Sequence, residues 1–275
     1  MASGKSWLKG CALGCGLIVV LSIVGTIGGG MALLKPFRTA IDSREALEET
    51  YGTQGDYRPP ADGIPAVDRV ETFLDVRAVM MEHCGGFSEI FAQFRRMDRL
   101  EDEGASGGEK FKEVIRTVKS AFSMPAKLGK LANARNEALA EYGMGLGEYT
   151  YISALTYYAW LEVKEFEFDD ENVDMEDSSP RVRRELRGML RHQLEDLQAS
   201  ADPDRGPLAD ELEAELARLD DDRGLYPWED NLPARIAEAL SPYRGRLETT
   251  FCPDTAPFAL SVHEQRGGGL SIHSD

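Results

Sequence analysis

The feature that most constrains this chain is an uncharged apolar segment near its start, Gly10–Leu34. Lys5 and Lys9 precede the segment, and Lys35 and Arg38 follow it. As a helix the segment would be about 37 Å long, which is enough to cross a hydrocarbon core of about 30 Å. The sequence therefore predicts a transmembrane anchor over these 25 residues.

Two alternatives to an uncleaved anchor stay open. Gly30-Met31-Ala32 has the small-x-small pattern of a signal-peptide cleavage site, although the apolar part of a signal peptide spans only about 7–15 residues. A buried core helix would carry more polar positions than Ser22 and Thr26. Gly25 and Gly29 have the G-x-x-x-G spacing at which two spanning helices approach closely, so a homodimer through this face is a further expectation.

The orientation of the anchor follows from its flanks. Their basic residues nearly balance, but a short basic tail over residues 1–9 favours a cytoplasmic N-terminus. We therefore expect an inner (plasma) membrane protein whose C-terminal body lies outside the cytoplasm. That body comprises a juxtamembrane segment and linker over 35–65, a helical soluble domain over 66–255 and a flexible tail over 256–275.

The charge of the body excludes one class of partner. The chain carries −17, and its first 40 residues hold four basic and no acidic residues, so the body after residue 40 carries −21. Such a surface repels phosphate backbones, and we expect no nucleic-acid partner. The expected partners are the lipid bilayer through residues 10–34 and other envelope proteins.

The hydrophobic pattern of the body is helical almost throughout. Pro65 and Gly206-Pro207 mark helix starts, and Pro125 is expected to kink or split a long helix. Only Pro257–Val262 has the character of an extended piece. The predicted helices cover residues 66–100, 108–141, 147–167, 179–200, 207–221 and 232–249. The predicted fold is all-α, an N-terminal transmembrane helix followed by a helical-bundle-like domain of about six helices.

Two of the four cysteines, Cys84 and Cys252, lie far apart in the body. They are the disulfide candidate if the body is exported, and two buried thiols if it is cytoplasmic. Cys11 and Cys15 lie at the start of the apolar segment, where no lipobox surrounds them. A zinc site that recruits His83 and His263 beside Cys84 and Cys252 lacks the usual ligand spacing, so no metal or cofactor is expected.

Two other motifs fail on their spacing. The acidic run Glu165–Asp177 matches the first three ligand positions of an EF-hand loop, but Met175 and Arg181 stand where Gly and Glu are required. Gly143-Met-Gly145-Leu-Gly147 follows a helical pattern and lacks the spacing of a phosphate-binding loop, which indicates a tight turn between helices.

Charged residues interrupt several apolar helix faces. Arg77 and Arg135 fall within such faces, and Glu148 and Glu162 lie at the two ends of a third face that also carries Tyr151 and Tyr158. An unpaired buried charge is costly, so the two arginines and two glutamates are expected to pair. The cluster is either an ion-pair network that fixes helix register or a recess for a small polar ligand or for catalysis.

No sequence motif names a reaction. Ser-His-Asp, Cys-His, H-E-x-x-H and P-loop patterns are all missing from the chain. We therefore expect a single-pass anchored protein with an acidic extracytoplasmic helical domain that acts in binding or scaffolding at the cell envelope, rather than an enzyme. The alternatives are a membrane-tethered enzyme or a small-ligand sensor that uses the Arg/Glu/Tyr cluster.

Overall fold

The computed structural model describes residues 30–102, 107–163, 179–200, 205–221, 226–229 and 231–255. All regular secondary structure in these ranges is helical, which confirms the all-α prediction. The α-helices are α2 (Gly30–Tyr51), α3 (Val67–Asp102), α4 (Gly107–Tyr142), α5 (Leu146–Ser153), α6 (Ser179–Gln198), α7 (Gly206–Asp220), α8 (Ala234–Leu240) and α9 (Arg244–Thr249). A π-helix, η2 (Ala154–Trp160), continues α5, and the 3₁₀ turns are η1 (Gln54–Asp56), η4 (Ser241–Tyr243) and η5 (Pro253–Thr255).

The predicted anchor lies outside the described residues except for positions 30–34, which form the first turn of α2. The glycine pair proposed for a homodimer, Gly25 and Gly29, and the tail after residue 255 also lie outside them. From residue 30 onward, none of the described helices has a stretch long and apolar enough to cross a membrane.

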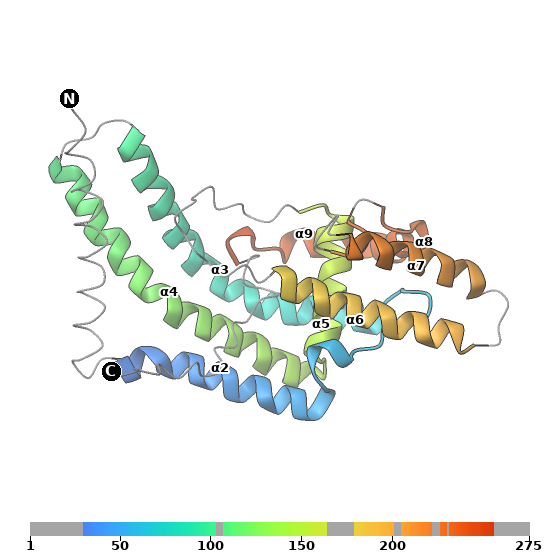
Figure 1. Cartoon of the computed structure of the whole chain (residues 1–275). Coiled ribbons are helices and arrows are strands. Elements are labelled where there is room, and N and C mark those ends of the chain that lie inside the picture. Colours follow the sequence, from blue (N-terminus) through green and yellow to red (C-terminus); the bar gives the residue numbers. More distant parts are fainter. Residues whose placement is uncertain are drawn as a thin grey trace, which may run out of the picture.

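Three long helices form one part of the body. Figure 1 shows α3 and α4 as an antiparallel hairpin, with α2 lying along the C-terminal half of α4. Helices α2 and α4 approach closely at Gly129, where a Cβ would lie 2.8 Å from the backbone nitrogen of Phe37. A side chain at this position would therefore push the two helices apart.

Helix α2 extends into the region over 35–65 that we expected to be a juxtamembrane segment and linker, and it ends there at Tyr51. Ala40, Arg44 and Leu47 are buried at the i, i+4, i+7 spacing of a helix face. The arginine in the middle of this face conceals its apolar character in the sequence. Arg44 tolerates burial because its Nε donates to Glu48 at 2.7 Å.

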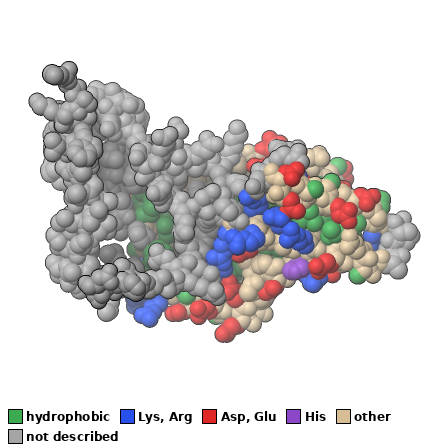
Figure 2. Space-filling view, viewed as in Figure 1, with side chains coloured by type: hydrophobic (Ala, Val, Ile, Leu, Met, Phe, Trp, Pro, Cys, Tyr) green, Lys and Arg blue, Asp and Glu red, His purple; other side chains and the backbone are tan. Residues whose placement is uncertain are grey.

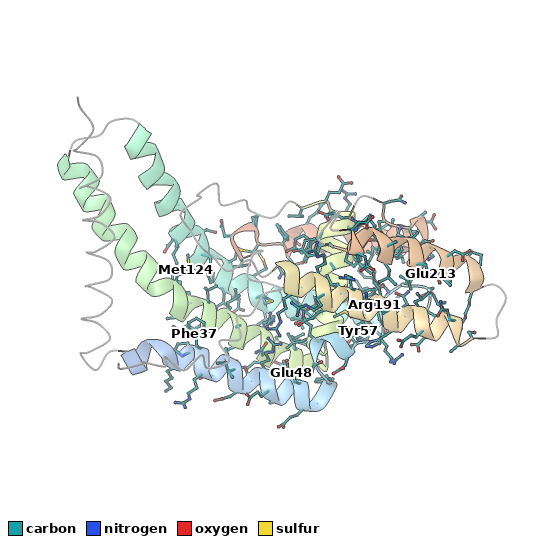
Figure 3. All side chains as sticks on the ribbon, in the orientation of Figure 1. Phe37, Glu48, Tyr57, Met124, Arg191 and Glu213 are labelled. Atoms are coloured by element: carbon teal, nitrogen blue, oxygen red, sulfur yellow. A yellow bond between two sulfur atoms is a disulfide. The ribbon has the colours of Figure 1, made fainter. Side chains whose placement is uncertain are left out.

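The centre of the body is the α5–η2 segment. Every residue from Leu146 to Ala159 is buried except Glu148. The backbone of η1 lies so close to α5 that a Cβ on Gly147 would be 2.5 Å from the carbonyl oxygen of Gln54. Figure 3 shows side chains crowded into this junction, with Tyr57 within it and Glu48 on α2.

Helices α6 and α7 pack against each other beside this centre, and α8 and α9 complete the body. Acidic side chains are scattered over the described part of the visible face, and basic side chains gather over α6 (Figure 2). Three basic groups of α6 have intramolecular partners: Arg181 bonds Glu185 at 3.0 Å, and Arg187 and Arg191 both contact Asp220. This basic face is thus part of an ion-pair network.

Both helices of the hairpin bend. Figure 1 shows that α3 and α4 each change direction about half-way along their length. The middle of α3 holds Gly85-Gly86, and the middle of α4 holds Pro125. Paired glycines and an internal proline are the usual causes of helix bending. Pro125 therefore lies within one continuous helix rather than splitting it.

Candidate functional site

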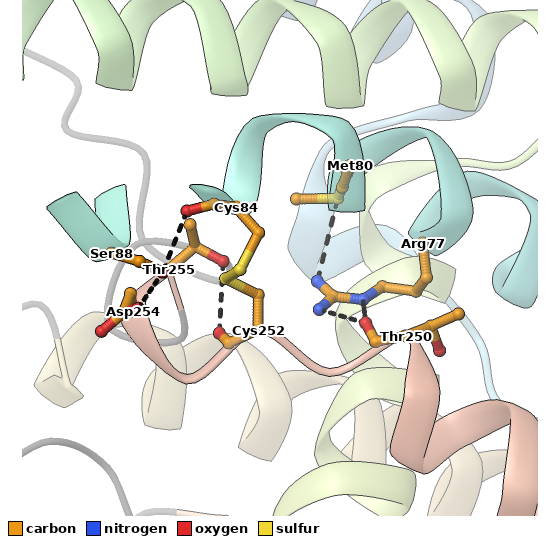
Figure 4. Close-up of a disulfide and its surroundings, with 8 residues drawn as sticks. All are labelled: Arg77, Met80, Cys84, Ser88, Thr250, Cys252, Asp254 and Thr255. Carbon is orange, nitrogen blue, oxygen red and sulfur yellow. Dashed lines mark hydrogen bonds between the residues drawn. A yellow bond between two sulfur atoms is a disulfide. The ribbon is translucent and has the colours of Figure 1, made fainter. Parts of the chain in front are cut away.

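Arg77 of α3 is only 2% exposed. Among the charged residues that the sequence analysis selected, it is the most deeply buried one in the described chain. Its Nε and Nη2 donate to the main-chain carbonyl of Thr250 at 3.1 and 2.8 Å, as Figure 4 shows. Its Nη1 donates to the hydroxyl of Tyr149 at 3.0 Å, and the guanidinium lies 5.0 Å from the centre of the Tyr157 ring. Main-chain and aromatic groups therefore solvate this cation.

The surroundings of Arg77 keep it charged. Burial lowers its pKa, but the oxygens of Tyr149 and Tyr157 raise it more, and the net shift is upward. The same contact acts on the tyrosine: burial raises the pKa of Tyr157, while Arg77 and the Thr250 hydroxyl lower it in part. At neutral pH Arg77 is therefore charged and the hydroxyl of Tyr157 keeps its proton. Groups that do not change their protonation state are better suited to holding the structure together than to transferring protons.

A disulfide lies next to this arginine. Cys84 of α3 is bonded to Cys252, with a Cα–Cα distance of 5.9 Å, inside the range that disulfides require. The hydroxyl of Ser88 donates to the carboxylate of Asp254. The chain from Thr250 to Thr255 is thus attached to α3 at three successive points.

The predicted pairing of Arg77 and Arg135 with Glu148 and Glu162 is wrong. Glu148 instead accepts two hydrogen bonds from Arg69, at 2.7 and 2.6 Å. Glu162 is exposed and has a positive φ of 50° beyond the end of η2, so it does not belong to the buried face at all.

Arg135 is buried as expected, at 3% exposed, but in a different group of residues. Its Nε and Nη2 donate to the side-chain oxygen of Asn136 at 3.3 and 3.1 Å. Asn136 in turn donates to the carbonyl of Ala40 and so joins α4 to α2. Burial lowers the pKa of Arg135 to about 10; Tyr149 raises it in part, and Arg44 lowers it further.

The two predicted tyrosines are buried but serve separate contacts. The hydroxyl of Tyr151 donates to the carbonyl of Gly63 at 2.9 Å, which fixes the loop before α3, and burial raises its pKa. Tyr158 stacks on Tyr226, with ring centres 3.9 Å apart. The six predicted residues therefore do not form one recess.

Residues that the sequence did not single out supply the actual partners. Tyr149, Tyr157 and Thr250 surround Arg77, and Arg69 holds Glu148. The sequence does not show that a tyrosine within an apolar stripe will bond to an arginine. A main-chain carbonyl is present in every residue, so the sequence cannot identify which one is the acceptor. Within the described residues, no group of three or more His, Cys, Asp or Glu side chains is arranged to hold a metal.

One end of the α2–α4 bundle has a different character. Two exposed large hydrophobic residues lie there: Tyr51 is 42% exposed and Tyr142 39%. The turn at Gly143 joins them, because Tyr51 lies over this turn and Tyr142 directly precedes it. We call these two residues the apolar end.

Exposed carboxylates lie near the apolar end along the chain, in the last two turns of α2 and α4. These residues are Glu45, Glu49, Glu137 and Glu141. An apolar centre with a charged rim is a common arrangement of protein-binding surfaces.

Comparison of the chain with protein-family models, with curated proteins and with solved structures gives no match.

Proposed function

We propose that this chain is a membrane-anchored binding or scaffolding protein of the cell envelope. The apolar end carries the proposal, because it places two aromatic side chains at the surface near exposed carboxylates of α2 and α4. Aromatic residues are enriched in interface cores, and surface carboxylates favour encounter with basic partners. The expected partner is an envelope protein that presents an apolar side chain among basic ones.

The buried polar groups favour binding over catalysis. An enzyme or small-ligand sensor would need the Arg/Glu/Tyr cluster to line one recess. Arg77 bonds the chain at Thr250, Glu148 bonds Arg69, and Tyr151 bonds the loop at Gly63. Because these groups are saturated by structural contacts, the surface is the better place to look for function.

The anchor and its orientation are part of the proposal. Residues 10–34 have the length and apolarity of a spanning helix, and residues 30–34 are helical in continuity with α2. The Cys84–Cys252 bond supports an oxidising compartment for the body, since disulfides persist outside the reducing cytoplasm.

Crosslinking tests the binding surface. A photoreactive phenylalanine analogue at Tyr142, in the full chain expressed in cells, should yield a discrete crosslinked product. The same analogue at Asp210, an exposed position on α7, is the matched control and should yield none. Equal products from both positions, or no product from Tyr142, would contradict the apolar end as a binding surface.

Reporter fusion tests the topology separately. Alkaline phosphatase fused after Asp275 should be active, whereas a fluorescent protein that folds only in the cytoplasm should stay dark at the same position. The reverse result would place the body in the cytoplasm and would leave the binding surface itself untouched.

A further inference from the structure

The outer half of α4, residues 107–124, carries apolar residues at helical spacing, which we call the apolar stripe. The members of the apolar stripe are Phe111, Val114, Ile115, Val118 and Phe122. They precede Gly129 by 18, 15, 14, 11 and 7 residues, and each of these intervals is close to a whole number of helical turns. Because α4 is one continuous helix through Pro125, the apolar stripe lies on the same side of α4 as Gly129.

The described contacts show which helix lies on each side of α4. On the side of Gly129 lies α2, because a Cβ there would be 2.8 Å from the backbone nitrogen of Phe37. On the other side lies α3, because Lys127 donates to the carbonyl of Gly86 at 2.7 Å. Lys127 and Gly129 are two residues apart, which is about 200° around a helix. The apolar stripe therefore continues the α2 side of α4 and not the α3 side.

The described part of α2 is too short to cover the apolar stripe. The two helices run in the same direction, and they cross where Phe37 lies at Gly129. Helix α2 begins at Gly30, seven residues before this crossing, which is level with Phe122. Figure 1 shows the outer half of the hairpin diverging from α2 at this end. Most of the apolar stripe thus lies beyond the start of α2, where the apolar segment 10–34 enters the body.

Basic residues border the apolar stripe. Lys112, Arg116 and Lys119 follow one another along one edge, and Lys110 lies at the other edge. Between positions 107 and 124, four basic and two acidic residues give a net charge of +2, whereas the chain after residue 40 carries −21. An apolar face bordered by Lys and Arg is typical of helices that lie in the headgroup region of a bilayer.

We propose that the outer half of α4 lies on the surface of the bilayer that holds the apolar segment, with its basic residues on anionic headgroups. This docking rests on the proposed membrane anchor. The apolar segment ends at Leu34, three residues before the crossing, and Pro125 lies four residues before it on α4. The bend at Pro125 is therefore level with the bilayer surface and turns the outer half of α4 along the membrane. The acidic body, which anionic lipids repel, stays away from the surface.

Photocrosslinking identifies what the apolar stripe contacts. The full chain, with a photoreactive phenylalanine analogue at Val118, is reconstituted in nanodiscs of phosphatidylcholine and phosphatidylglycerol. Mass spectrometry should find phospholipid adducts. Ser120, on the opposite side of the same turn, is the matched control and should give at least tenfold fewer adducts. Equal adducts at both positions, no lipid adduct at Val118, or products with residues 10–29, with α3 or with a second copy of the chain would overturn the proposal.

Hydrogen exchange tests the role of lipid charge. Exchange at residues 108–123 should be at least tenfold slower in discs with phosphatidylglycerol than in discs of phosphatidylcholine alone. Lys112→Glu with Arg116→Glu should remove this difference. Arg184→Glu with Arg244→Glu, at exposed positions of α6 and α9, is the matched control and should keep it. The same slowing in the Lys112/Arg116 variant would overturn the proposal. Exchange at residues 146–159 reports whether the body is folded, and Lys112→Gln with Arg116→Gln replaces the reversal variant if it is not.

Elution with the discs tests the anchor itself. A chain that elutes with the discs but gives no lipid adduct at Val118 keeps the anchor and loses the docking of α4. A chain that elutes apart from the discs contradicts the anchor, and the docking fails with it.

Discussion

Replacing Arg77 by methionine should destabilise the body by about 3 kcal/mol. The variant loses three hydrogen bonds from the charged guanidinium to oxygen, worth roughly 1.5–3 kcal/mol each, besides a long contact with the Met80 sulfur, and leaves the Thr250 carbonyl without its donors. The variant also no longer has to bury a charge, which saves several kcal/mol of desolvation free energy. The net loss of stability is therefore smaller than the summed free energy of the lost hydrogen bonds. Methionine preserves most of the packing of the aliphatic stem. Arg77→Ala should cost about 2 kcal/mol more, since the three atoms that methionine has beyond Cβ are missing, and each contributes about as much as a buried methylene, ~0.8 kcal/mol.

Urea unfolding of the full chain in mild detergent, followed by circular dichroism, measures this difference. Arg184→Met is the matched control, because Arg184 is exposed on α6, and it should change the free energy of unfolding by less than about 0.5 kcal/mol. A loss below about 0.5 kcal/mol for Arg77→Met would refute the reasoning. It would mean that the guanidinium bonds only balance the cost of burying the charge.

Three further predictions follow from the described contacts. Gly129→Leu should separate α2 from α4 and lower the melting temperature measured by circular dichroism, whereas Gly245→Leu, on open surface, should not. Glu162→Gly should stabilise the body by about 0.5–1 kcal/mol in urea titrations, because the left-handed φ of 50° suits glycine. A large loss of stability would instead favour the buried ion pair of Glu162 that the sequence suggested. Because the folded pKa of Arg135 is lowered to about 10, the folded state releases its proton first, and stability should rise with pH above that value relative to Arg135→Met, by about 1.4 kcal/mol per pH unit. Unfolding titrations of both proteins between pH 9 and 11 check this, and a constant difference would contradict it.

The helices after residue 65 could be predicted because their apolar positions repeat at helical spacing. The expected helix over 66–100 is α3, Val67–Asp102, and the one over 108–141 is α4, Gly107–Tyr142. The burial of Arg77 and Arg135 was predictable for the same reason, since an arginine within an apolar stripe turns inward with its helix. α2 was missed because a buried arginine interrupts its short apolar face.

The partners of the buried charges could not be predicted in the same way. A projection at 100° per residue placed Glu148 and Glu162 on one face, but the segment becomes a π-helix at Ala154. A wider turn advances by a smaller angle per residue, so the projection loses its phase beyond that point. The chain then ends its helix at Trp160, and Glu162 lies outside the core. For Arg77 the acceptor is a main-chain oxygen 173 residues away, which only the tertiary fold brings near.

Gly129 marks the place where α2 and α4 are held close together. It lies four residues after Pro125, on the body side of the bend in α4. The close α2–α4 crossing at this glycine fixes the C-terminal half of α4 to the helix that continues the apolar segment. On α3, the residues that follow Gly85-Gly86 are held as well, because Phe87 and Ile90 are buried and Ser88 donates to Asp254. A force applied through α2 would therefore reach the body through the α2–α4 crossing, with α3 held to the same core.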